Sequence, residues 1–152
     1  FQGSENVAAV VVFEDGKKQN AEYRNYIIKG IDGQDDFGSL REVVRRRYGK
    51  VDSPRPDLLI VDGGKAQLES VLLAMKEVGV EFPVVGLAKA RTERSFKSQK
   101  IQASEERFFL PGVKLPKAIK NLEILRLVTE IRDEAHRFAI TFHRKRRDQL
   151  PK

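Results

Sequence analysis

The sequence predicts an α/β fold, a mixed sheet flanked by helices, formed as one domain over residues 1–152. Short apolar runs alternate with longer segments whose apolar residues recur at helical spacing. The runs at 58–61 and 83–88 are continuous, which suits strands buried on both faces of a parallel sheet. Near the N-terminus, two apolar segments flank a turn and predict an antiparallel hairpin. A hairpin followed by helix, strand, helix and strand indicates an α/β architecture with a mixed sheet.

The first half of the chain is expected to hold the hairpin and one helix. Residues 7–13 (VAAVVVF) run into a turn at Glu14–Lys17, and residues 21–28 return as the second strand. Gly16 can adopt the positive φ that a hairpin turn needs. Asp35 and Asp36 then open a helix that ends in three arginines, and both features suit the helix dipole. The expected apolar face of this helix consists of Phe37, Leu40, Val43, Val44 and Tyr48.

The second half is expected to contain two further strands and two further helices. The strand at 58–61 stops at Asp62-Gly63-Gly64, a helix follows over 65–78, and the next strand covers 83–88. Residues 89–117 are predicted to be irregular and charged, with a short strand and turn at 108–112. Asn121 begins the long final helix. The apolar side of that helix is expected to consist of Leu122, Leu125, Val128, Ile131, Ala135, Phe138 and Phe142.

The composition restricts the kinds of partner and chemistry. The chain of 152 residues carries a net charge of +7 with a pI near 9.7, which favours polyanionic partners such as nucleic acid. It has no cysteine, so disulfides, thiolate metal sites and cysteine nucleophiles are excluded, and a cytoplasmic location is expected. No apolar run approaches the roughly 20 residues of a membrane span. A soluble protein with a polyanionic partner is therefore expected.

Asp62 is the acidic residue best placed for chemistry. It directly follows a buried strand, and ligands of open α/β sheets gather at the carboxyl ends of strands. Gly63 and Gly64 have no Cβ and so let a backbone segment or a phosphate approach closely. Lys65 begins the next helix, whose free N–H groups and dipole favour an anion. The same residues also fit a plain strand-to-helix turn, in which Asp-Gly is common, and they do not form a P-loop.

The final helix offers a candidate general base or metal ligand. His136 lies in a polar setting, with Asp133 three residues earlier on the same helical face. An unperturbed imidazole titrates near neutrality and suits either role. Asp133 is expected to orient His136 or to pair with an arginine. His143 returns to nearly the same face about two turns later, but chelation on a helix normally uses i, i+4 spacing, so His143 is expected to face DNA or solvent.

Two basic clusters suggest a DNA track. One is Arg45-Arg46-Arg47, and the other is Arg144, Lys145, Arg146 and Arg147. Either cluster could simply be a solvated face, which is the usual role of a charge run. Two clusters on a chain that also carries an acid–histidine pair favour phosphate contacts. The expected DNA-binding residues are Lys65, Lys89, Arg45, Arg46, Arg144, Lys145, Arg146 and Arg147.

Five segments of the chain carry a resemblance to a known family. They are NVAAVVVFEDGK, AEYRNYIIKGIDGQDDFGSLREVVRRRYG, PDLLIVDGGKAQL, VVGLAKA and IRDEAHRFAITFHRKRR. In this order they resemble the C-terminal endonuclease domain of UvrC, the incision subunit of bacterial nucleotide excision repair. The resemblance covers nearly the whole chain and is loosest over residues 91–120. Any single segment would be weak support, whereas the combination is specific.

The resemblance implies an RNase H-like fold and an endonuclease that uses Mg²⁺ or Mn²⁺ to hydrolyse a DNA phosphodiester bond on the 5′ side of a lesion. The family's site is an aspartate–aspartate–histidine set. Its second aspartate falls on Asp62 and its histidine on His136, and a further acidic position tied to this incision falls on Asp36. The family's first aspartate is expected upstream of Phe1, on a central strand between the hairpin and the Asp62 strand. The implied partners are double-stranded DNA with a lesion and, through other parts of the full-length protein, UvrB with UvrA upstream.

Three functions remain open at the level of the sequence. The enzyme would need Asp62 and His136 together, with a single tightly held metal ion as the expected arrangement. The alternative is a catalytically incomplete DNA-binding module of a repair assembly, which would bind DNA in a salt-sensitive way without cutting it. A basic scaffold domain would instead place Asp62 and His136 too far apart to share a ligand.

Overall fold

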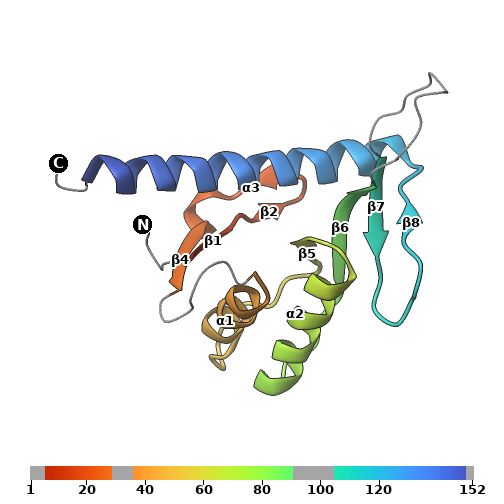
Figure 1. Ribbon diagram of the computed structural model, residues 1–152, viewed down its shortest axis with the longest axis horizontal. Helices are drawn as coiled ribbons and strands as arrows, with labels where there is room; N and C mark the ends of the chain where they lie inside the picture. The colour runs from red at the N-terminus through yellow and green to blue at the C-terminus, as the bar shows by residue number, and fades with distance from the viewer. Residues whose placement is uncertain (1–5, 29–35, 91–104, 150–152) are drawn as a thin grey trace.

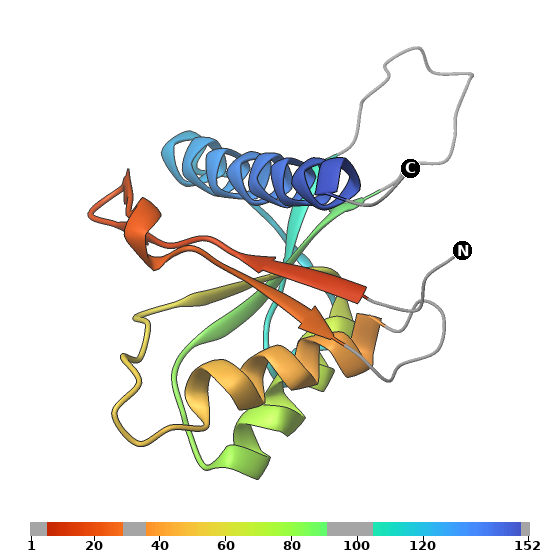
Figure 2. The same cartoon turned by 90° about the vertical axis from the view of Figure 1, so that its left-hand side faces the viewer.

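A computed structural model describes residues 6–28, 36–90 and 105–149, and these residues form three layers. One long helix, α3 (Leu122–Gln149), crosses one face of the strands. The helices α1 (Asp36–Tyr48) and α2 (Lys65–Val78) pack against each other on the opposite face. Figure 1 shows α3 lengthwise above the strands, and Figure 2 shows the same layers nearly along the axis of α3. The predicted α/β architecture with a mixed sheet flanked by helices is confirmed.

The predicted hairpin is present, but its first strand is shorter than expected. Strand β1 (Asn6–Val10) pairs antiparallel with β4 (Arg24–Ile28). Two-residue strands, β2 (Phe13–Glu14) and β3 (Lys17–Lys18), form the tip, followed by a short 3₁₀ turn, η1 (Asn20–Glu22). Both central turn residues have positive φ, 54° at Asp15 and 78° at Gly16, as a type I′ turn requires.

The larger sheet has four strands and is mixed. Strand β5 (Leu59–Asp62) runs parallel to β6 (Val84–Ala90), as expected. β7 (Glu105–Phe109) and β8 (Lys117–Ala118) continue the sheet in antiparallel register. The irregular region predicted for 89–117 is therefore partly wrong, because 105–109 is a regular strand that begins three residues before the expected one. Charged residues obscured this strand. Residues 89–90 belong to β6, 110–116 connect β7 to β8, and 91–104 lie outside the described residues.

Two of the strand edges that are open within the described parts of the chain belong to β5 and β1. There, β5 is hydrogen-bonded only to β6, and β1 only to β4. The hairpin and the four-stranded sheet are therefore separate hydrogen-bonded units that lie beside each other beneath α3 (Figure 1). β1 and β5 are the strands that the resemblance expects to flank the family's first catalytic strand.

The core lies mainly between α1, α2 and the inner face of β5 and β6. Its buried members are Val44, Tyr48, Val61, Leu68, Val71, Ala74, Met75, Val80 and Val84. The expected apolar faces are mostly correct, with two exceptions at helix starts: Phe37 is 44% exposed and Leu122 is 74% exposed. Asn121 caps α3, where its side-chain oxygen accepts hydrogen bonds from the backbone N–H groups of Glu123 and Ile124. Among the described helices, none combines the length and apolar character needed to cross a lipid bilayer.

Candidate active site

Asp62 is the last residue of β5, and its position depends on a tightly packed glycine turn. The N–H of Gly63 donates to the carbonyl of Leu87 at 2.9 Å, so the backbone continues along β6 past the end of β5. The N–H of Gly64 donates to the Gln67 side chain at 3.0 Å, which gives one half of a capping box for α2. A Cβ at Gly86 would lie only 2.8 Å from the Gly63 carbonyl oxygen. The sequence pointed to Gly63 and Gly64, whereas the close backbone approach at this turn is made by Gly86.

The structure brings Asp62 and His136 together. The distance from Asp62 Oδ2 to His136 Nε2 is 3.5 Å, and the two side chains are 59% and 64% exposed. One comes from the sheet and the other from the middle of α3, so only the tertiary fold makes them neighbours. This separation excludes the arrangement in which the two residues lie too far apart to share a ligand.

The pair has the dimensions of two ligands on one cation. Oxygen and nitrogen atoms that each lie about 2.1 Å from the same ion are about 3.0 Å apart at a right angle and about 3.5 Å apart at a somewhat wider angle. A carboxylate oxygen and an imidazole nitrogen are both suitable donors for Mn²⁺, while Mg²⁺ prefers the oxygen. Within residues 6–28, 36–90 and 105–149, no third acidic or histidine side chain completes a cluster. The described residues therefore place two potential metal donors side by side, without a third.

Two buried polar contacts that the sequence did not reveal hold α3 in place. Arg132, one turn before His136, forms a buried ion pair with Glu106 of β7, and each side chain is 10% exposed. Glu134 is 4% exposed and accepts a 2.9 Å hydrogen bond from the Tyr23 hydroxyl.

The contacts of Glu134 shift two pKa values. The Arg137 guanidinium, and after it the Tyr23 hydroxyl, hold the pKa of Glu134 at about 2, below its ordinary 4.5, although burial opposes this. Burial, and then the bond to Glu134, raise the pKa of Tyr23 to about 12 from 10.0.

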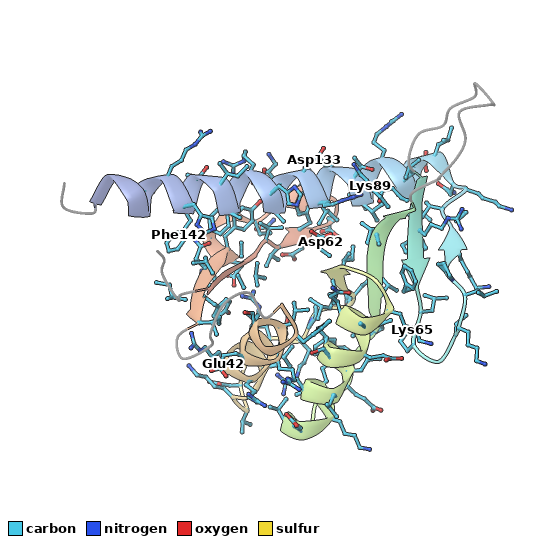
Figure 3. All side chains as sticks on the ribbon, viewed as in Figure 1. Glu42, Asp62, Lys65, Lys89, Asp133 and Phe142 are labelled. Atoms are coloured by element: carbon cyan, nitrogen blue, oxygen red, sulfur yellow. The ribbon has the colours of Figure 1, made fainter. Side chains whose placement is uncertain are left out.

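Lys89 lies on the same face of the sheet as Asp62. Asp62 is in register with Leu87, and Lys89 is two residues further along β6, so the two side chains point toward α3. Figure 3 shows both on the α3 side of the sheet. Glu106 is directly opposite Lys89 in β7, but its carboxylate is paired with Arg132. Among the described residues Lys89 has no ion-pair partner and is exposed, so it can reach a ligand at Asp62.

The other predicted residues are dispersed. Lys65 starts α2 with its Nζ 3.9 Å from Glu69, and it lies away from α3 in Figure 3. Asp36 starts α1, but its side chain lies outside the described residues. Asp133 is exposed on α3 and makes no hydrogen bond or ion pair with any residue that the structure describes. His143 is exposed two turns beyond His136.

The two predicted basic clusters differ in their surroundings. Arg45 pairs with Glu42 and Glu77, and Arg46 pairs with Glu42. Glu42 lies on α1, on the side of the molecule away from α3 (Figure 3). Arg144 and Lys145 are exposed near the end of α3 and have no ion-pair partner in the described segments. Arg146 and Arg147 continue this helix, and their side chains lie outside the described residues.

The chain is similar to known proteins over nearly its whole length. A family model described as the UvrC RNase H endonuclease domain matches residues 1–140. The chain is 51% identical over 150 residues to the UvrABC system protein C of Bdellovibrio bacteriovorus, covering 97% of this chain and 24% of that protein. It is 44% identical over 156 residues to the protein of the same name from Bacteroides fragilis, covering 98% and 24%. A similar match, 45% over 149 residues, covers 98% of this chain and 24% of the Thermotoga petrophila protein. The chain thus spans about a quarter of the length of these relatives.

Proposed function

Because the chain belongs to the family of UvrC RNase H endonuclease domains, we propose that it hydrolyses a phosphodiester bond of DNA with the help of a divalent cation. The reaction proposed is the 5′ incision beside a lesion in nucleotide excision repair. The observation that carries this proposal is the 3.5 Å separation of Asp62 and His136 at the open end of the sheet. Both side chains are largely exposed, so a phosphate group can reach them from solvent.

Each residue has a role in this proposal that follows from its chemistry. Mg²⁺ or Mn²⁺ would supply Lewis acidity and an activated water when bound. The Asp62 carboxylate holds the cation, as a hard oxygen donor does. His136 acts either as a second ligand or as the base that orients the attacking water. Lys89 places a positive charge on the same face, where it can contact a phosphate oxygen.

The proposed partners follow from the family and the charge. They are double-stranded DNA with a lesion and, through other parts of the full-length protein, UvrB, with UvrA acting earlier in the pathway. The net charge of +7 favours the DNA, and the exposed Arg144 and Lys145 at the end of α3 would contact its phosphates. The site of action would be the cytoplasm.

A second candidate function is a DNA-binding module that does not cut. It is favoured by one observation, namely that the described residues supply only two donors to the metal site. This candidate predicts salt-sensitive DNA binding with no nicking even at high Mn²⁺ concentration. The enzyme predicts Mn²⁺-dependent nicking that is lost in His136→Gln and retained in the matched control His143→Gln.

Metal binding at Asp62 can be tested without any measurement of activity. The chain has only two histidines, so the proton NMR signals of their imidazole rings are easily assigned. Substoichiometric Mn²⁺ should broaden the His136 signals far more than the His143 signals, because paramagnetic relaxation falls steeply with distance. Asp62→Asn should abolish this difference, whereas Asp57→Asn, an exposed carboxylate just before β5, should keep it. Equal broadening of both histidines in the unmodified chain would rule out the proposed metal site.

The side of the incision needs a separate experiment. A duplex with a single lesion and a label at the 5′ end of the damaged strand reports the position of the cut through the length of the labelled product. A product that ends before the lesion supports the proposed 5′ incision. A product that extends past the lesion contradicts it.

A further inference from the structure

We propose that Tyr23 and Glu134 act as a positioning pair, which holds α3 so that His136 faces Asp62. The proposal rests on the metal site proposed above and adds two residues that contact neither the metal nor DNA. Tyr23 precedes β4 in the hairpin and Glu134 lies on α3, so the pair connects two elements that are far apart in the sequence. Glu134 is two residues before His136.

Glu134 is the centre of a dense hydrogen-bonded cluster. Its two carboxylate oxygens accept bonds from the Tyr23 hydroxyl at 2.9 Å and from Arg137 at 2.9 and 2.7 Å. The ammonium group of Lys18, at the hairpin tip, is 3.4 Å away. Three residues, two from the hairpin and one from α3, therefore satisfy one buried carboxylate. Breaking such a contact is costly because it leaves a buried polar group without its partner.

Tyr23 also contacts α3 through its ring. The ring packs edge-on against Phe138, with 5.0 Å between centroids and an interplanar angle of 69°. Glu134 and Phe138 are four residues apart and share one face of α3. His136 is midway between them and points about 200° around the helix axis, since each residue turns by about 100°. Tyr23 thus holds the face of α3 that lies behind His136.

A second contact attaches the sheet-facing side of α3 to the four-stranded sheet. Arg132 is four residues before His136, on the same face, and is paired with Glu106 of β7. The pairs Tyr23–Glu134 and Arg132–Glu106 therefore anchor one stretch of α3 to the hairpin and to the sheet. This determines both the rotation of the helix and its distance from β5. A functional side chain has to be held within about 0.5 Å and 10–20° of its working geometry, which two such anchors can achieve.

The chain provides a matched pair of variants for the test. Tyr23→Phe removes only the hydroxyl bonded to Glu134 and keeps the ring against Phe138. Tyr26→Phe, in β4, removes the hydroxyl that accepts a 3.1 Å hydrogen bond from Arg47 of α1, on the other side of the hairpin. Each variant loses one tyrosine hydrogen bond, so the two variants are matched in the kind of contact that they remove.

Two measurements on these variants decide the proposal. Mn²⁺ affinity, followed through the His136 signals, should fall about 10-fold in Tyr23→Phe, as expected when a group that supports a metal ligand is lost, and should not change in Tyr26→Phe. Amide hydrogen exchange over residues 134–138 should accelerate in Tyr23→Phe only. Equal effects of the two variants on both measurements would show a general structural role and overturn the proposal.

The exchange measurement also separates the two proposals. If Mn²⁺ does not bind at Asp62 in the unmodified chain, the proposed function fails. Local acceleration of exchange around His136 in Tyr23→Phe would then still support the positioning of the helix. If Mn²⁺ binds normally to Tyr23→Phe and exchange over 134–138 is unchanged, the positioning proposal fails and the metal site remains.

Discussion

The carbonyl oxygen of Gly63 lies directly against Gly86, so that a Cβ on residue 86 would be 2.8 Å from it. Gly86→Ala must therefore push the Asp62–Gly63 turn away from β6. We expect a loss of about 1–3 kcal/mol in the free energy of unfolding, as in other overpacked cores. Mn²⁺ binding should weaken as well because Asp62 precedes the displaced residue. Urea unfolding and Mn²⁺ titration measure the two effects, and unchanged values for both would contradict the tight packing.

The buried Arg132–Glu106 pair should contribute to the free energy of unfolding. Glu106→Gln leaves the Arg132 guanidinium buried without its counter-charge and should cost about 3–5 kcal/mol. Replacing both residues by methionine should recover much of this loss, because two charges no longer need to be desolvated. Chemical denaturation of the three proteins provides the comparison. A double variant less stable than Glu106→Gln would argue against this explanation.

The lowered pKa of Glu134 predicts an acid-sensitive contribution to stability. A carboxylate whose folded-state pKa lies below the unfolded value stabilises the fold above the unfolded pKa, here 4.5, and loses this contribution as the pH falls toward about 2. Glu134→Gln should thus be less stable at neutral pH and show a shallower decline in the free energy of unfolding between pH 4.5 and 2. Urea unfolding across this range is the measurement. If the free energy of unfolding of the two proteins changed in parallel with pH, the lowered pKa of Glu134 would be contradicted.

Lys89 should contribute to DNA affinity through one phosphate. Lys89→Met is expected to reduce the slope of log K against log salt concentration by about 0.9, the value for one lost phosphate contact. Lys117→Met, an exposed lysine of β8 at the far edge of the same sheet, carries the same charge change and serves as the control. Fluorescence anisotropy at several salt concentrations measures both slopes. Equal slopes would assign the effect to net charge alone.

The two basic clusters can be compared at equal net charge. The double variant Arg144→Gln with Lys145→Gln should weaken DNA binding more than Arg45→Gln with Arg46→Gln. The reason is that Glu42 and Glu77 already neutralise part of the charge of the second cluster. Both double variants remove two positive charges, so any difference reflects location. A larger effect at Arg45 and Arg46 would place the DNA along α1 instead of α3.

Most of the fold could be predicted because its elements follow local rules. The helix at 65–78, the type I′ turn at Asp15-Gly16 and the parallel pair β5–β6 all carry their signals in adjacent residues. Strand β7 was underestimated, since Glu105, Glu106 and Arg107 are charged and resemble loop residues. The Arg132–Glu106 pair explains how this strand tolerates a buried acid, and that partner is contributed by a helix that follows later in the chain.

The site was only partly predictable for the same physical reason. Asp62 and His136 each stand out by residue type and setting, and the resemblance connects them. Their supporting residues do not stand out. Nothing in the sequence around Tyr23 indicates a hydrogen bond to Glu134. Nothing around Gly86 indicates that the Gly63 carbonyl packs against it. Such contacts depend on tertiary packing and leave no periodic pattern.

The length of α3 has a geometric consequence for any bound duplex. The helix is continuous from Leu122 to Gln149, so His136 and Arg144 are separated by eight residues, or about 12 Å along the axis. That interval corresponds to about three to four base pairs of B-form DNA at about 3.4 Å each. If the proposed incision takes place, a duplex that lies along α3 and is held at both points would be cut at a constant offset from its anchored phosphates. The distance between His136 and Arg144 along α3 would then determine which phosphodiester bond is hydrolysed.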